Sequence, residues 1–225
     1  MKSVEVSEKW EHMGAPFRTL SASLDAITFP QKPRGYIGAS TLGHACDRYI
    51  WLQKKTELET SISPETHFIF EQGHWVESYV IERIKQLKDW CLLETQTEVK
   101  TDYLQGHTDG LIKNLMTSEL YLLEIKSMND KSFKKAQNHG IRQSHPQYYD
   151  QCQIYLSLTE KTNKLILIAI NKNDGKRYEE LIDLNEEYAY NLLKRAERIA
   201  SLKQIPNGLY NENKPNFNCN FCNFK

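Results

Sequence analysis

The order of helical and extended segments along the chain predicts an α/β fold, with a central mixed β-sheet and helices on its faces. Two helical segments come first and three strand segments follow; a pair of helices, a strand hairpin and a last helix complete the series. The 225 residues fit a single domain, and 40% hydrophobic residues with ten Gly and seven Pro suffice for a packed core. We therefore expect one globular domain.

The helices are predicted from apolar residues at helical spacing. In 39–53 these residues include Leu42 and Tyr49, and Ser40 is placed to cap the first turn. The segment 64–88 is longer and begins at Ser63-Pro64, a helix start signal. Three more helices are expected, over 131–138, 147–158 and 184–203.

Strands are predicted where short apolar or alternating segments are separated by polar, turn-forming residues. The first three, 92–99, 103–113 and 119–127, follow one another closely enough to form a meander. Two more, 164–171 and 177–183, flank an Asn-Asp-Gly-Lys sequence whose Asp-Gly pair is typical of a tight hairpin turn.

Outside this core, residues 1–36 show no sustained period and are expected to form an N-terminal arm. The domain itself is expected to span 37–205, followed by a cysteine-containing tail over 206–225 that packs near Cys46. The longest apolar stretch, 164–170, is far shorter than the roughly 20 residues of a membrane span, and the charged N-terminus lacks a secretory signal. We expect no membrane association and a cytoplasmic location.

Two carboxylates and a lysine stand out in the strand segments. Asp109 lies in a predicted strand, where an unpaired charge is costly, and Glu124 and Lys126 share one face of the next strand because they are two residues apart. Oxygen ligands of this kind suit magnesium, which can polarise a phosphate and activate a bound water. The alternative is that Asp109 belongs to a turn and that Glu124 and Lys126 form an exposed pair.

The pattern resembles the PD-(D/E)XK superfamily of nucleases, in which an Asp and a following Glu-x-Lys lie on adjacent strands. The RecB-like branch adds a His on an upstream helix, matched by His74 with Glu77 after it. It also adds a downstream Gln-x-x-x-Tyr, matched by Gln151 and Tyr155. The resemblance covers 38–178 and is closest to small exonucleases of the phage and CRISPR-associated types.

This resemblance implies a restriction-endonuclease-like core and a metal-dependent DNA nuclease, expected to be an exonuclease, in a bacterial or phage-infected cell. His74, Asp109 and Glu124 would bind magnesium or manganese, Lys126 would assist the attacking water, and Gln151 and Tyr155 would position substrate or the lysine. Individually, His74 could be a structural helix residue, and Gln151 and Tyr155 a polar edge of a core helix.

The alternative function is a non-catalytic DNA-end-binding or assembly subunit that retains the nuclease fold. A recombination partner protein or a homo-oligomer fits either function. A more distant alternative is a structural zinc protein whose acidic residues are incidental.

Three cysteines suggest a second metal site. Cys219 and Cys222 have the two-residue spacing that lets two thiolates hold one ion, and the related nucleases place a segment like that of Cys46 near the C-terminus. RecB-like exonucleases with an iron-sulfur cluster use one N-terminal and three C-terminal cysteines, and the fourth is missing here. His44 could complete a zinc site instead, and free thiols are the remaining alternative. Cys91 and Cys152 are expected in the core.

The net charge is zero, with 29 basic and 29 acidic residues, so any basic surface for nucleic acid must be local. One such basic patch follows the Glu-x-Lys strand. It contains a single acid, Asp130, and would bind DNA phosphates with a steep dependence on salt. A solvated helix face is the competing interpretation. The residues of this patch are Lys131, Lys134, Lys135 and Arg142.

Overall fold

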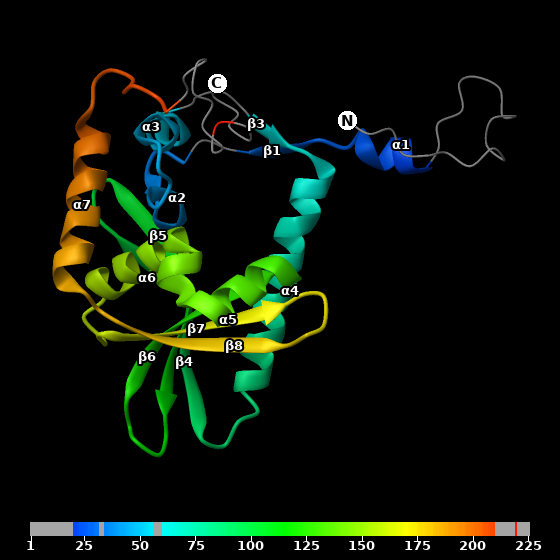
Figure 1. Cartoon of the computed structure of the whole chain (residues 1–225), viewed down its shortest axis with the longest axis vertical. Helices are drawn as coiled ribbons and strands as arrows, with labels where there is room; N and C mark the ends of the chain where they lie inside the picture. The colour runs from blue at the N-terminus through cyan, green and yellow to red at the C-terminus, as the bar shows by residue number, and fades with distance from the viewer. Residues whose placement is uncertain (1–19, 32–33, 56–59, 210–218, 220–225) are drawn as a thin grey trace, which may run out of the picture.

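A six-stranded mixed sheet forms the centre of the protein, as a computed structural model shows for residues 20–31, 34–55, 60–209 and 219 (Figure 1). β4, β5 and β6 form the expected antiparallel meander, β7 runs parallel to β6, and β8 returns antiparallel to β7. A two-residue strand, β2, adds in parallel to β5. The strand bounds are β2 Ile37–Gly38, β4 Trp90–Lys100, β5 Leu104–Asn114, β6 Leu120–Met128, β7 Lys164–Asn171 and β8 Arg177–Asp183.

Helices cover both faces of this sheet, which confirms the predicted α/β fold (Figure 1). The larger core lies under α2, α3, α5, α6 and α7, and a smaller core lies under α4 alone. Along β6, Leu122 faces the larger core and Leu123 and Ile125 face the smaller one, so Glu124 shares the larger core's side. The helix bounds are α2 Ala39–Leu42, α3 Asp47–Lys55, α4 Pro64–Ile84, α5 Asp130–Ser144, α6 Pro146–Leu158 and α7 Glu186–Ser201.

Local sequence signals account for several boundaries. The Ser63 side chain caps α4 by accepting a hydrogen bond from the backbone N–H of Thr66 at 3.3 Å. The strands of the hairpin, β7 and β8, have the predicted bounds, and Gly175 in their turn has φ +74°, which glycine adopts without steric cost. No helix within the described residues is both long and apolar enough to span a membrane.

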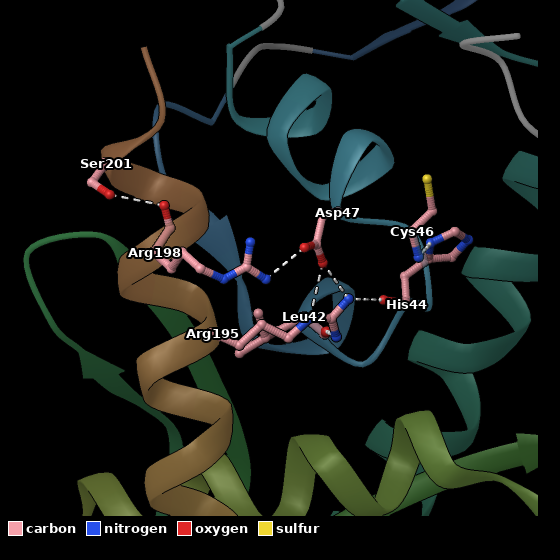
Figure 2. A network of polar contacts seen from close by, with 7 residues as sticks. All are labelled: Leu42, His44, Cys46, Asp47, Arg195, Arg198 and Ser201. Atoms are coloured by element: carbon pink, nitrogen blue, oxygen red, sulfur yellow. Dashed lines mark hydrogen bonds and ion pairs between the residues drawn. The ribbon is translucent and has the colours of Figure 1, made fainter. Parts of the chain in front are cut away.

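The helix predicted over 39–53 is wrong as a single element, because the chain leaves the helix after Leu42 and re-enters it at Asp47. Ser40 does not cap it either; Gly38 stands at the cap position, without a side-chain bond. The guanidinium of Arg195 on α7 donates to the carbonyls of Leu42 at 2.8 Å and His44 at 2.7 Å (Figure 2). These two carbonyls therefore bind a distant helix instead of continuing a local one.

Replacing Arg195 with leucine is expected to lower the free energy of unfolding by about 2 kcal/mol, because two carbonyls lose their partner and the Asp47 carboxylate loses one of its two arginines in a partly buried site. Urea denaturation measures the change. Arg198→Leu is the matched control, since the Arg198 side chain bonds Asp47 alone among the described residues and is more exposed, and the change should cost less than about 1 kcal/mol. Equal losses in both variants would contradict this role.

The helix predicted over 131–138 continues to Ser144 as α5, with a break at Gly140, whose φ is +70°. The carboxylate of Glu180 on β8 accepts the N–H of Ile141 at 2.7 Å and the hydroxyl of Tyr178 at 2.6 Å. The Glu180 carboxylate thus takes the place of the backbone carbonyl that the N–H of Ile141 would bond in an unbroken helix.

A small two-stranded ribbon was not predicted. β1 (Phe29–Gln31) pairs antiparallel with β3 (Thr60–Ile62), and a short helix, α1 (Leu20–Asp25), precedes it. The pairing joins segments about 30 residues apart, so no local pattern marks it. Residues 1–19 of the expected arm lie outside the described residues, as does most of the expected tail.

Candidate active site

Asp109 and Glu124 meet where β5 and β6 separate. The ladder between the two strands pairs Gly110 with Leu123, and Asp109 and Glu124 are the next residues beyond that pair. At this point Asp109 Oδ2 accepts the backbone N–H of Ile125 at 2.7 Å. The Asp109 side chain thereby takes the place of a backbone carbonyl, which holds it beside β6.

Lys126 connects the strands to α6. Its Nζ lies 2.5 Å from Glu124 Oε1, donates to Gln151 Oε1 at 3.0 Å and sits 4.8 Å from the centre of the Tyr148 ring. Gln151 in turn donates through Nε2 to the Tyr155 hydroxyl at 2.8 Å, one helical turn further along α6. A continuous chain of polar contacts therefore runs from Glu124 through Lys126 and Gln151 to Tyr155.

Gly106 allows α6 to approach this closely. A Cβ at this position would lie 2.7 Å from Tyr155 Cε1 and 2.8 Å from Ala39 Cβ, which is too close for any other residue. Gly106 is three residues before Asp109 on the same strand, and the predicted site did not include it.

The site holds more carboxyl groups than ammonium groups. Burial, with the nearby charge of Glu124, raises the pKa of Asp109 to about 8. Burial likewise raises the pKa of Glu124, although Lys126 opposes this shift. Burial alone would lower the pKa of Lys126, but the negative charges of Glu124 and Asp109 raise it by more, so Lys126 stays charged. One ammonium does not stabilise the charged form of both carboxyl groups, and a bound cation would supply the missing positive charge.

The second carboxylate oxygen of Glu124 is buried. The residue is 1% exposed, and within the described residues its Oε2 has no hydrogen-bond partner. A buried carboxylate oxygen left in this way is costly unless it binds something. The observation fits a metal ligand, because a hard cation prefers carboxylate oxygens.

A cavity of about 690 Å³ opens onto these residues. Asp109, Glu124 and Lys126 line its sheet side, Tyr148 and Gln151 its α6 side, and His67, Phe70, His74 and Glu77 its α4 side. Arg34, Ser40 and Lys172 also line it. The sequence interpretation missed Arg34 and Tyr148, which carry no motif.

His74 faces this cavity but contacts neither carboxylate. Its side chain is 72% exposed, and its Nδ1 lies 3.4 Å from Glu71 Oε1. Within the described residues, no group of three or more His, Cys, Asp or Glu is arranged to hold a metal ion. Magnesium commonly binds one or two carboxylates and keeps several waters, so Asp109 and Glu124 suffice as its protein ligands.

The basic patch lies partly elsewhere. Lys131, Lys134 and Lys135 are exposed on α5, and Lys134 pairs with Asp130 at 2.7 Å. Arg142 stacks on Tyr149 and Tyr188, 5.3 and 5.8 Å from their ring centres, and lines a separate cavity of about 420 Å³. The basic residues that line the first cavity are Arg34, Lys126 and Lys172.

Of the candidate cysteine ligands, Cys46 and Cys219 are buried, and Cys222 lies outside the described residues. His44 Nδ1 accepts the N–H of Cys46 at 3.0 Å, and its ring stacks on Tyr49 with centres 4.2 Å apart. Cys152 is fully buried and Cys91 half-buried. A second metal site on these residues stays a prediction.

Comparison with solved structures shows an exonuclease fold. The alkaline exonuclease from Laribacter hongkongensis superposes with a TM-score of 0.54 over 73% of this chain and 86% of its own, at 14% identity. The same enzyme in complex with dAMP gives a TM-score of 0.50 over 73% and 86% of the two chains, at 13% identity. By sequence, no protein family and no curated protein matches the chain.

Proposed function

We propose that this protein is a divalent-metal-dependent deoxyribonuclease of the RecB-like branch of the PD-(D/E)XK superfamily, and that it acts as an exonuclease. The observation that carries the proposal is the buried Glu124 carboxylate, with one oxygen on Lys126 and the other without a hydrogen-bond partner in the part of the chain that the structure describes. The exonuclease fold supports it.

The carboxylates of Asp109 and Glu124 would bind magnesium or manganese, with His74 on the cavity wall as a further ligand. Such a cation, when bound, polarises the scissile phosphate and lowers the pKa of a bound water. The chain's own residues supply the rest of the chemistry. Lys126, held charged by Glu124 and Asp109, would orient the attacking water and offset the negative charge that develops on the phosphate.

Gln151 and Tyr155 would act through Lys126. The Gln151 amide accepts from Lys126 and donates to the Tyr155 hydroxyl, so it fixes the direction of the ammonium. Arg34 and Lys172 line the same cavity and would contact phosphates on either side of the bond that breaks. The α5 lysines, Lys131, Lys134 and Lys135, and Arg142 would contact more distant phosphates.

A non-catalytic DNA-end-binding subunit is the alternative, and the buried Glu124–Lys126 pair argues against it. Burying two charges costs free energy that a binding surface does not require. Phosphate contacts from exposed lysines would be enough for DNA binding alone.

End-labelled linear DNA, single- and double-stranded, tests the proposal. We expect mononucleotide release with Mg²⁺ or Mn²⁺, none with EDTA, and a loss of at least about a hundredfold in Glu124→Gln. Glu119→Gln, immediately before the same strand and paired with Lys164 at the surface, is the control and should cleave normally. DNA binding without cleavage at any concentration of either metal would support the alternative function instead.

A further inference from the structure

One residue of the central sheet has an unusual backbone conformation. Gln96, within β4, has φ +52°. Among the described residues, the other non-glycine residue with positive φ is Ser118, which precedes β6 in a loop. Residues other than Gly, Asn and Asp rarely adopt this conformation, and a strand interior gives no steric reason for it. Such strain persists where surrounding contacts impose it.

The register places Gln96 opposite Asp109. β4 and β5 pair Thr95 with Gly110 and Thr97 with Thr108, which leaves Gln96 facing Asp109 across the ladder. In a regular ladder, opposite residues project to the same side of the sheet. Gln96 instead donates its side-chain amide Nε2 to Glu77 Oε1 on α4, at 2.5 Å.

Glu77 belongs to the candidate active site. It lies three residues after His74 on α4, is half-buried, and lines the same cavity as Asp109 and Glu124. Its negative charge is near enough to contribute to the raised pKa values of both Asp109 and Glu124. Three carboxylates therefore share a site in which the buried Glu124 Oε2 has no hydrogen-bond partner within the described residues.

We propose that Gln96 is a positioning residue that fixes Glu77 as an outer carboxylate of the cation site. The amide of Gln96 holds one oxygen of Glu77 and leaves the other free to accept hydrogen bonds from the water shell of a cation bound by Asp109 and Glu124. The left-handed backbone is what lets a residue opposite Asp109 reach α4. This inference rests on the proposed metal dependence of the site.

Mn²⁺ affinity, measured from the electron paramagnetic resonance signal of free Mn²⁺, tests the role apart from activity. Gln96→Gly is expected to weaken Mn²⁺ binding about tenfold. The same change should not lower the melting temperature of the metal-free protein, because glycine adopts a positive φ freely. A merely structural residue would lower both quantities together.

Gln105→Gly is the matched control. Gln105 donates Nε2 to Glu98 Oε1, also at 2.5 Å, on the same pair of strands, but it has no positive φ, and its partner Glu98, unlike Glu77, does not line the cavity. This control should lower the melting temperature and leave Mn²⁺ affinity unchanged. Wild-type Mn²⁺ affinity in Gln96→Gly would overturn the inference.

A double variant shows whether Gln96 acts through Glu77. Glu77→Gln alone should weaken Mn²⁺ binding about tenfold, and Gln96→Gly added to it should cause no further loss. Independent, additive losses would overturn the inference while the proposed function stands. Failure of the wild-type protein to bind Mn²⁺ at all would overturn both.

Discussion

Replacing Lys126 with methionine is expected to lower the rate constant of DNA hydrolysis at least about a thousandfold. Methionine keeps most of the length of the side chain and removes the only ammonium that contacts Glu124 among the described residues. The transition state then loses its nearest fixed positive charge, and Gln151 loses the donor that its carbonyl accepts from. Single-turnover hydrolysis of labelled DNA at saturating Mn²⁺ measures the effect.

Two control variants separate chemistry from folding and from binding. Lys126→Met leaves the buried Glu124 carboxylate unpaired, so the double variant Lys126→Met/Glu124→Gln should regain stability and remain inactive. Lys172→Met removes an ammonium that lines the same cavity but bonds Gln72 at 3.4 Å, and it should raise KM more than it lowers kcat. A Lys126→Met enzyme within tenfold of the wild-type rate would contradict the assigned role.

Most of the sheet could be predicted because its signals are local. An Asp-Gly turn fixes the β7–β8 hairpin, and alternation along β6 places Glu124 and Lys126 on one face. The fold class followed from the order of such segments. The break at Gly43–Cys46 could not be predicted, because the group that accounts for it, Arg195, lies about 150 residues away in the sequence.

The same distinction holds for the candidate site. Asp109, Glu124 and Lys126 could be singled out because charges in a strand need an explanation, and Gln151 and Tyr155 only through the resemblance to RecB-like nucleases. Arg34 could not, since it lies in a segment without periodicity and reaches the cavity only through the tertiary fold. Gln96 could not either, because a positive φ at glutamine leaves no trace in the sequence.

Without divalent cations, the free energy of unfolding is expected to fall as the pH rises from about 6.5 to 8. The pKa of Asp109 is raised to about 8 in the folded protein, mainly by burial, against roughly 3.9 when unfolded. In this window the folded state holds a proton that the unfolded state has released, so stability drops by up to about 1.4 kcal/mol per pH unit. Burial lowers the pKa values of His44 and His145, so these two residues make the free energy of unfolding rise with pH instead. Their contribution is complete near pH 6.5, the lower limit of this window, and does not obscure the fall above it.

Asp109→Asn should reduce this slope to the part that the raised pKa of Glu124 contributes, because asparagine can still accept the N–H of Ile125 and carries no charge at any pH. The variant should therefore be more stable than the wild type at pH 8. It should also no longer be stabilised by Mn²⁺, which in the wild type would offset the cost of the buried Asp109 charge. Asp174→Asn is the control, since pairing with Lys176 lowers the pKa of Asp174 and confines its effect to acid pH. Urea denaturation at four pH values measures the slopes. An Asp109→Asn protein with the wild-type slope would show that another group titrates between pH 6.5 and 8. Asp109 would then not be the carboxyl group whose charge a cation has to balance.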